Sequence, residues 1–207
     1  MEEGQMKFVE LTSEKEINTY REMTSVQVDV LFPIEYLKRS RVVVWMDHEG
    51  VIKGGFVIVT KPPFRVLESI PQRVRNHLDV EPFECVEVTG LWLHHSLENK
   101  RDSARFWLKL YREVWSMKKE NIIYAYDIKK KKLKNIYQKG KPEVLYKGIT
   151  IRLQGMKTSE VESVEMVRRK NVLLTPLFTP SFLISRLFGK RRMSHLDIVP
   201  SNFQERK

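Results

Sequence analysis

The sequence contains a single cysteine, Cys85, among its 207 residues. One cysteine allows neither an intrachain disulfide nor a cysteine-rich metal site, and its position in an apolar run indicates packing rather than nucleophilic chemistry. No uninterrupted apolar run reaches about 18 residues, the length that spans a bilayer, and the acidic start lacks the basic and apolar regions of a signal peptide. We therefore expect a cytoplasmic protein with no bound metal.

Motifs of nucleic-acid-binding proteins are also missing: the sequence has no zinc-finger spacing, no ribonucleoprotein aromatic motif and no helix-turn-helix pattern. What the chain has in excess is positive charge, because 37 Lys and Arg residues face 26 Asp and Glu residues and give a formal net charge of +11. Such an excess attracts acidic partners, namely nucleic acid, anionic lipid or an acidic carrier protein. Of these three, nucleic acid is the least favoured by the sequence.

The chain is long enough to bury one substantial core, with 42% hydrophobic residues, and we expect a single domain over residues 1–175. The composition shifts where Pro176 and Pro180 precede a mixture of apolar and basic side chains. We expect residues 176–207 to form a basic amphipathic extension that packs on the domain or at an interface. Its part 181–192 is also the candidate for peripheral contact with the inner membrane.

Local signals in the first half predict strands and helices in alternation. Ser13 is followed three residues later by Glu16, a capping box that marks the start of a helix after a first strand at 6–11. Two runs rich in β-branched residues, 41–47 and 51–60, flank a His-Glu-Gly turn and predict a hairpin.

The second half reads as a long strand at 83–93, a polar loop, an amphipathic helix at 103–119 and a strand at 121–127. A short basic helix then ends in Ile136-Tyr137-Gln138-Lys139-Gly140, before another strand. This order resembles the closing half of the GNAT acyltransferase fold, in which a helix ending in an aromatic-x-x-Gly turn lies between the last two strands. The resemblance implies an α/β (α+β) fold with a mixed central sheet and helices on both faces. The alternative is any α/β domain with a Gly-capped helix.

Two runs look like one branch of that superfamily, the autoinducer synthases and N-acyl amino acid synthases. They are 64–71, FRVLESIP, and 86–93, VEVTGLWL. This branch takes acyl chains from acyl carrier protein and often has a glutamate, a small residue, an arginine and an aromatic residue on the central strand. Glu87 matches the glutamate, whereas Gly90 occupies the place of the arginine and the amino-terminal tryptophan and arginine motif is not visible. The resemblance implies acyl transfer from a carrier to an amine such as an amino acid, and the departures argue against homoserine lactone production.

Acyl transfer to an amine needs a base for the ammonium proton and an acid for the departing thiolate. Glu87 is the candidate base, because its apolar neighbours imply burial and desolvation raises the pKa of a carboxyl group. A structural ion pair with a nearby Arg or Lys is the alternative role. Tyr137 matches the position at which many GNAT enzymes place the acid, and simple packing is its alternative role.

The phosphate of the donor is expected at the start of the 103–119 helix, where backbone N–H groups form an anion site. The phosphate loop of the superfamily falls on residues 99–104, NKRDSA, which lack its internal glycine and so disfavour close wrapping of a coenzyme A pyrophosphate. A single phosphate, as in a phosphopantetheine arm, is the better match. We expect no permanently bound cofactor, with acyl-phosphopantetheine on a carrier protein or acyl-coenzyme A as co-substrate. The candidate donor-binding residues are Leu91, Leu93, Lys100, Arg101, Ser103 and Ala104.

Five lysines border the side on which the carrier's arm enters in this fold: Lys129, Lys130, Lys131, Lys132 and Lys134. Because acyl carrier proteins are strongly acidic, we expect these lysines to steer the carrier, with a solvated face as the alternative. The resemblance also implies that strands 83–93 and 121–127 part to admit the arm. Apolar residues of 66–78 and of the segment around Phe182 are expected to line an acyl tunnel.

A different class of function stays open beside the enzyme. The chain could be a noncatalytic GNAT-like module that binds an acidic protein, an anionic lipid surface or nucleic acid. The missing loop glycine favours this alternative, whereas the presence of both Glu87 and Tyr137 opposes it.

Overall fold

The computed structural model describes residues 6–94 and 100–172, with the side chains of Lys100, Arg101, Lys132 and Leu133 left out. Within these residues lies a seven-stranded sheet in the order β1-β2-β3-β4-β5-β7-β6. All neighbouring strands are antiparallel except β4 and β5, which are parallel. The strands are β1 (Lys7–Leu11), β2 (Arg41–Met46), β3 (Ile52–Val59), β4 (Cys85–Leu93), β5 (Asn121–Asp127), β6 (Glu143–Ile149) and β7 (Val161–Arg168).

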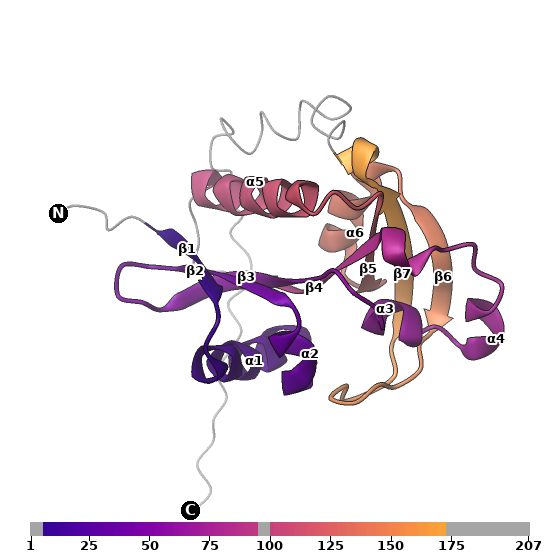
Figure 1. Cartoon of the computed structure of the whole chain (residues 1–207), viewed down its shortest axis with the longest axis horizontal. Coiled ribbons are helices and arrows are strands. Elements are labelled where there is room, and N and C mark those ends of the chain that lie inside the picture. The colour runs from indigo at the N-terminus through magenta and orange to yellow at the C-terminus, as the bar shows by residue number, and fades with distance from the viewer. Residues whose placement is uncertain (1–5, 95–99, 173–207) are drawn as a thin grey trace, which may run out of the picture.

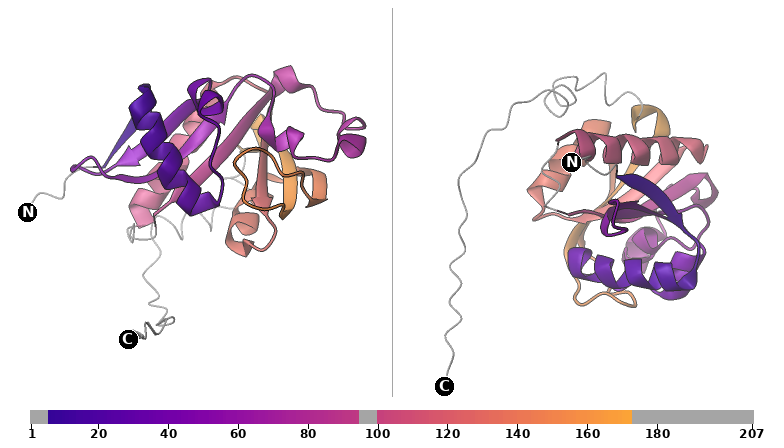
Figure 2. Two further views of the ribbon diagram at one scale, coloured as in Figure 1. Left: turned by 90° about the horizontal axis from the view of Figure 1, so that it is seen from below. Right: turned by 90° about the vertical axis from the view of Figure 1, so that its left-hand side faces the viewer.

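Helices cover both faces of this sheet, as predicted (Figures 1 and 2). In the view of Figure 1, α1 and α2 lie below the sheet, and α5 and α6 lie on the upper side. No helix among residues 6–94 and 100–172 is long and apolar enough to cross a membrane. The helices are α1 (Glu14–Val28), α2 (Ile34–Lys38), α3 (Arg65–Glu68), α4 (Gln72–Arg75), α5 (Lys100–Ser116) and α6 (Lys131–Tyr137), with 3₁₀ turns at Pro82–Glu84 and Gln138–Gly140.

The predicted helix start at Ser13 is confirmed. Ser13 Oγ accepts a hydrogen bond from the backbone N–H of Glu16, and the Glu16 carboxylate accepts one from the backbone N–H of Ser13 at 3.2 Å. This capping box satisfies two N–H groups that a helix start leaves without partners. The predicted hairpin is confirmed too, because β2 and β3 pair antiparallel from Arg41–Ile58 to Met46–Ile52.

Each face of the sheet has its own apolar core. On the lower face, Tyr20 and Leu37 are fully buried against β2 and β3. On the other face, Phe106 of α5 lies 5.7 Å from the Phe56 ring and 5.9 Å from the Trp45 ring, measured between ring centres. Fully burying side chains of this size stabilises the fold by roughly 1.5–3 kcal/mol each.

The strand order corrects one expectation. The helix that ends in the Tyr137 turn, α6, connects β5 to β6, and a further strand, β7, follows β6 and inserts between β5 and β6. The sequence did not predict β7 because Glu162, Glu165 and Arg168 interrupt its apolar pattern. The strand is buried all the same, since it pairs on both edges and even Glu165 has only 2% exposure.

Two other boundaries differ from the predicted ones. Helix α5 begins at Lys100 rather than at Ser103. Strand β4 begins at Cys85 rather than at Phe83. Residues 82–84 form a 3₁₀ turn that begins with a proline, and a turn cannot pair as a strand.

β4 and β5 pair only at their beginnings. Their register includes Cys85–Asn121, Val86–Ile122 and Glu87–Ile123 and then ends. The two strands therefore part beyond Glu87, as the resemblance implied. Residues 87–93 of β4 and 125–127 of β5, around this opening, line a cavity.

A bulge in β4 accounts for this divergence. Thr89 pairs with Val57 and Trp92 pairs with Gly55, so that Gly90 and Leu91 both face a single residue of β3. Gly90 has a φ of 59°, a conformation that favours glycine, and its carbonyl accepts a 2.7 Å hydrogen bond from Tyr20 Oη. Because a bulge bends its strand, β4 turns away from β5 at this point.

Candidate active site

A cavity of about 380 Å³ lies where β4 and β5 part. Its walls come from the end of α1, from α3, from the second halves of β4 and β5, and from the segment that precedes β7. Glu87 and Tyr137, the two residues predicted to act in catalysis, both line it. The fold thus brings together a carboxylate from the central strand and a phenol from the end of α6.

Glu87 is completely buried, although it faces the cavity. Its Oε1 accepts a hydrogen bond from Tyr36 Oη at 2.8 Å and one from the backbone N–H of Val66 at 3.3 Å. Its Oε2 has no hydrogen-bond partner among the described residues, and no described Lys or Arg forms an ion pair with the carboxylate. One oxygen of a buried carboxylate beside the cavity therefore has no hydrogen-bond partner among the described residues.

Burial raises the pKa of Glu87 to about 7, in spite of four influences that act in the opposite direction. These are the hydrogen bond from Tyr36, the backbone N–H groups of Val66 and Arg65, and the charge of Arg65. A carboxyl group with such a pKa is ionised in a large fraction of molecules at neutral pH and is still basic enough to accept a proton. This combination is what a general base requires.

Tyr137 ends α6 and points its ring at two tyrosines of β5. The ring centres are 4.4 Å apart for Tyr124 and 5.5 Å apart for Tyr126. Burial, reinforced by the neighbouring Tyr111 and Glu165, raises the pKa of Tyr137 above its ordinary value. Its hydroxyl is thus protonated at neutral pH and is a weaker acid than an exposed tyrosine.

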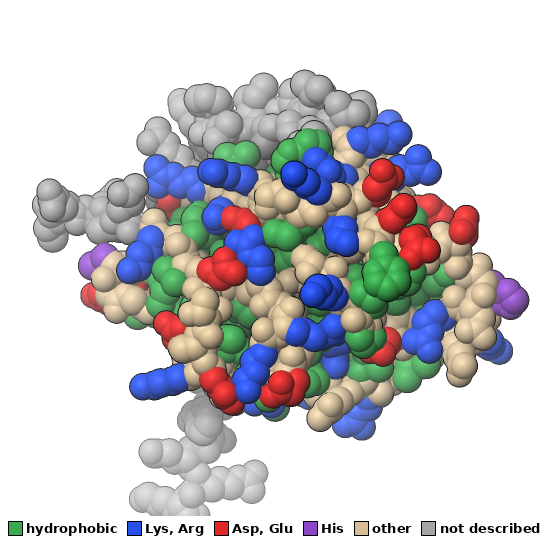
Figure 3. Space-filling view, in the orientation of Figure 1, with side chains coloured by type: hydrophobic (Ala, Val, Ile, Leu, Met, Phe, Trp, Pro, Cys, Tyr) green, Lys and Arg blue, Asp and Glu red, His purple; other side chains and the backbone are tan. Residues whose placement is uncertain are grey.

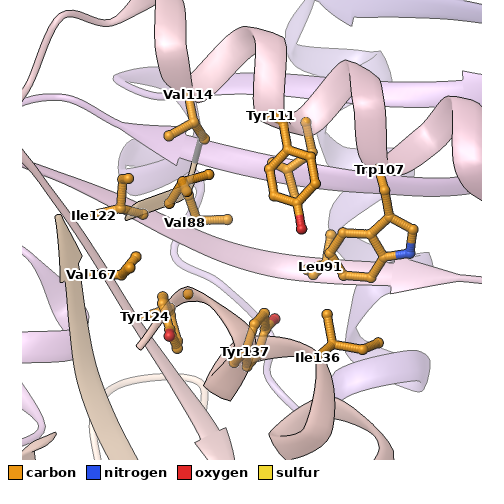
Figure 4. A pocket seen from close by; sticks show the side chains of 13 residues that line it. Val88, Leu91, Trp107, Tyr111, Val114, Ile122, Tyr124, Ile136, Tyr137 and Val167 are labelled. Carbon is orange, nitrogen blue, oxygen red and sulfur yellow. The ribbon is translucent and has the colours of Figure 1, made fainter. Parts of the chain in front are cut away.

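A smaller, apolar cavity of about 70 Å³ lies beneath α5 (Figure 4). Trp107 and Tyr111 of α5 face Tyr124 and Tyr137 across it, and Figure 4 shows the Tyr111 hydroxyl directed toward the sheet. Three residues, Val88, Leu91 and Tyr137, line both cavities. The two spaces therefore adjoin at the parting of β4 and β5.

The candidate donor-binding residues divide into two groups. Leu91 lines both cavities and Leu93 lines the larger one. Ser103 and Ala104 lie in the first turns of α5, where both are buried. The side chains of Lys100 and Arg101 lie outside the described residues, as do residues 95–99 of the predicted phosphate loop.

The candidate carrier-binding lysines surround the start of α6. Lys129, Lys130 and Lys131 are exposed, Lys134 is partly buried, and the Lys132 side chain is not described. Lys130 also lines the larger cavity. On the face shown in Figure 3, Lys and Arg side chains are interspersed with Asp and Glu side chains.

The acyl tunnel expected along residues 66–78 and around Phe182 stays a prediction. Of residues 66–78, Val66 and Ser69 line the larger cavity, whereas Ile70 is fully buried in a core cluster with Val164. The segment around Phe182 lies outside the described residues, together with the predicted extension 176–207 and its part 181–192.

Three residues of the site were not identified from the sequence. Tyr36 binds the carboxyl group of Glu87 from 51 positions away, and no local pattern marks it. Arg65 lines the larger cavity; it lies in the run that resembles autoinducer synthases, which was a usable signal. Glu165 accepts hydrogen bonds from the hydroxyl groups of both tyrosines that pack on Tyr137, at 3.3 and 2.7 Å. It lies on the strand that the sequence did not predict.

No protein-family model and no curated protein sequence matches this chain. Several solved structures, however, are similar to this chain. The N-acyl amino acid synthase FeeM from uncultured soil microbes aligns with a TM-score of 0.58 at 11% identity, covering 82% of this chain and 93% of FeeM. The AHL synthase LasI aligns with a TM-score of 0.60 at 11% identity, covering 83% and 94%.

An acetyltransferase with a different acceptor aligns as well. The spermidine/spermine N-acetyltransferase SpeG from Vibrio cholerae gives a TM-score of 0.54 at 7% identity, covering 82% of this chain and 96% of SpeG. At such identities these likenesses establish the architecture. The predicted fold class is confirmed: this chain has the GNAT fold, which it shares with FeeM and LasI.

Proposed function

We propose that this protein is an N-acyltransferase that moves an acyl group from a phosphopantetheine thioester to an amine. The observation that carries the proposal is the buried Glu87 carboxylate, whose Oε2 has no partner among the described residues and which lines the same cavity as Tyr137. A buried charged group without full pairing is costly, so its retention points to use in chemistry. The fold agrees, since FeeM is an N-acyl amino acid synthase and SpeG an N-acetyltransferase.

In the proposed reaction the pantetheine arm enters where β4 and β5 part and bonds to the open edge of β4 near Leu91 and Leu93. Glu87 Oε2 accepts a proton from the acceptor's ammonium group, directly or through a water. The free amine attacks the thioester carbonyl carbon, the carbon–sulfur bond breaks, and the Tyr137 hydroxyl gives a proton to the departing thiolate, while the attacking nitrogen loses its second proton to solvent. Solvent then restores both residues to their starting protonation states.

The smaller cavity is the proposed place of the acyl chain. It is apolar and adjoins the larger cavity at Leu91 and Tyr137, where the thioester would lie. Apolar walls favour the transfer of an alkyl chain out of water by about 0.8 kcal/mol for each methylene group. The Trp107 and Tyr111 side chains bound the space and would set the length of chain that fits.

The proposed donor is an acyl carrier protein rather than coenzyme A. Two sequence features support this choice: the missing glycine in residues 99–104, and the lysines before and within α6, which suit an acidic carrier. Purified protein should release free thiol from acyl-carrier thioesters faster than from matched acyl-coenzyme A when given a panel of amines at moderate salt. Faster use of acetyl-coenzyme A would overturn the carrier assignment. Absence of transfer from either donor to any amine would favour the noncatalytic binding module instead.

A further inference from the structure

Glu165 on β7 is a buried carboxyl group that the proposed reaction does not use. It has 2% exposure, and among the described residues no Lys or Arg forms an ion pair with it. Its Oε1 accepts hydrogen bonds from Tyr126 Oη at 2.7 Å and from Ser163 Oγ at 2.9 Å. Its Oε2 accepts one from Tyr124 Oη at 3.3 Å. Because a buried polar group is costly without hydrogen bonds, this carboxyl group and the three hydroxyl groups hold one another in place.

The strand register brings these four side chains together. In the antiparallel pair of β5 and β7, Tyr124 lies opposite Glu165, and Tyr126 lies opposite Ser163. Residues that lie opposite each other share a face of the sheet, and a diagonal neighbour is within reach of a long side chain. Glu165 therefore reaches the hydroxyl of its own partner and that of the tyrosine two positions along β5. One carboxyl group holds two neighbouring phenol rings.

The two rings that Glu165 holds pack against Tyr137. The centre of the Tyr137 ring lies 4.4 Å from that of Tyr124 and 5.5 Å from that of Tyr126. Figure 4 shows the Tyr124 and Tyr137 rings side by side. No hydrogen bond to another described residue fixes the Tyr137 hydroxyl. Within the described residues, the direction of this hydroxyl therefore depends on how its ring is packed.

The three rings stand where the two cavities adjoin. Tyr124 lines the smaller cavity, Tyr126 lines the larger one, and Tyr137 lines both. Burial and the neighbouring Tyr111 and Glu165 also raise the pKa of Tyr137, so that its hydroxyl is a weak acid. Such a group assists the departure of a thiolate through its placement beside the developing charge more than through its acidity.

We propose that Glu165 is a positioning residue, which holds Tyr124 and Tyr126 by their hydroxyl groups and thereby directs the Tyr137 hydroxyl at the departing thiolate. This role rests on the proposed acyl transfer and adds a residue that acts through others. Groups that act in catalysis must be held within about 0.5 Å of their working position by the side chains that support them. Glu165 itself lines neither of the two described cavities.

The test compares two thioester donors that carry the same acyl group, with the amine held constant. Acyl-pantetheine releases an alkyl thiolate, which benefits from a proton donor, whereas acyl-thiophenol releases an aryl thiolate, which leaves without one. Glu165→Met keeps the length of the side chain and removes both acceptor oxygens. It should lower kcat with acyl-pantetheine roughly 10-fold with KM little changed, and should keep kcat with acyl-thiophenol within about 2-fold of the parent value.

Two further variants separate positioning from general stability. Glu165→Gln should restore the parent rate, because its amide oxygen and nitrogen can bond to the same three hydroxyl groups. In a Tyr137→Phe background, Glu165→Met should cause no further loss, since the hydroxyl that it positions is absent. Where Glu165→Met alone does not fold, combining it with Tyr124→Phe and Tyr126→Phe removes the buried donors together with their acceptor, and the same selective loss is expected.

Glu113→Met is the matched control. Glu113 of α5 is a buried carboxyl group with 7% exposure that pairs with Arg41 at 2.7 Å and with Lys109, and it lines neither described cavity. Any loss of rate in this variant should be the same with both donors. Equal loss with both donors in Glu165→Met, or a further loss in the Tyr137→Phe background, would overturn the inference, because either pattern indicates a structural role.

A measurement without turnover tests the position of the ring itself. With Tyr137 replaced by 3-fluorotyrosine, the fluorine NMR resonance should move toward that of the free amino acid in Glu165→Met, and should stay in place in Glu165→Gln and Glu113→Met. A resonance that Glu165→Met does not move would contradict the positioning. Acyl transfer that depends on Tyr137 but not on Glu165 contradicts this inference alone. A protein that transfers no acyl group to any amine contradicts the proposed function and, with it, the role of Glu165 in that reaction.

Discussion

Tyr36 Oη donates a 2.8 Å hydrogen bond to Glu87 Oε1, so the two oxygens of this carboxylate have different surroundings. Oε1 is held by protein donors, whereas Oε2 has none among the described residues. Burial and the neighbouring Glu87 raise the pKa of Tyr36 well above its ordinary value, so that this phenol stays protonated and keeps donating. The carboxylate is thereby oriented with one oxygen committed, and the other oxygen is the one to which the proposed mechanism gives the role of base.

Glu87→Gln tests the base. Glutamine keeps the shape of the side chain and can still accept the hydrogen bond of Tyr36, but it cannot take a proton from an ammonium group. We expect the acylation rate to fall roughly 100-fold or more. The rate is measured as thiol release at saturating donor and acceptor, with circular dichroism to show that the fold is retained. A folded variant that works at the parent rate would remove Glu87 from the mechanism.

Glu87 should also make the stability of the protein depend on pH. Its pKa is raised from 4.5 to about 7 in the folded state. Between these values the folded protein holds a proton that the unfolded chain has released, so the free energy of unfolding should decrease as pH rises from 4.5 to about 7. The total decrease from this group is about 3 kcal/mol. Urea denaturation at about pH 5 and about pH 8 measures it.

The same denaturation series with Glu87→Gln provides the comparison. A glutamine does not titrate, so this part of the decrease should be absent from the variant. An identical pH dependence in parent and variant would show that the Glu87 pKa is not raised in the folded protein.

Tyr36→Phe tests how the pKa of Glu87 is set. The Tyr36 hydroxyl stabilises the ionised carboxylate, and its removal should raise the pKa of Glu87 further. The rising limb of kcat/KM against pH, which follows deprotonation of the base, should move upward by roughly one unit. Tyr146→Phe is the control, since Tyr146 Oη donates a 2.8 Å hydrogen bond to the exposed Ile149 carbonyl oxygen and does not contact Glu87 among the described interactions. A midpoint that stays in place in Tyr36→Phe would count against Glu87 as the titrating base.

Tyr137→Phe tests the acid. The ring and its packing on Tyr124 and Tyr126 would remain, and only the proton donor would be lost. A thiolate is a tolerable leaving group, so we expect a loss of roughly 10-fold, smaller than that of Glu87→Gln. The loss should appear in kcat with KM nearly unchanged, because the hydroxyl acts only in the transition state. A variant that binds donor and acceptor and turns over like the parent would assign Tyr137 to packing.

Charge reversal tests the carrier surface. Changing Lys130, Lys131 and Lys134 to Glu should slow association with an acyl carrier protein and flatten its dependence on salt, with little effect on chemistry once the thioester is bound. Stopped-flow measurements over a range of ionic strength give both quantities. The matched control reverses Lys7, Lys15 and Lys61, which are exposed and lie on β1, on α1 and in the segment after β3. If both triple variants respond alike, only the net charge matters and the α6 lysines form an ordinary solvated face.

The sequence alone determined the features that depend on neighbours in the chain. The Ser13 capping box and the β2–β3 hairpin involve residues a few positions apart, so the local pattern predicts them. The burial of Glu87 was predictable for a similar reason, because valines flank it on a continuous apolar strand. The assignment of Glu87 and Tyr137 to one site came from the resemblance of short motifs to the GNAT superfamily, and in the structure both residues line one cavity.

Only the tertiary structure decided the rest of the site, because the contacts involved join distant parts of the chain. Tyr36 reaches Glu87 across 51 positions, and Arg65 reaches Gln154 across 89. Strand β7 is stabilised by pairing on both edges rather than by its own charged sequence, and it places Glu165 under Tyr124 and Tyr126. Such positions depend on how the sheet and its covering helices pack, which no window of sequence contains. The physical reason is that strand pairing and side-chain burial are non-local, whereas helix caps and tight turns are satisfied within a few residues.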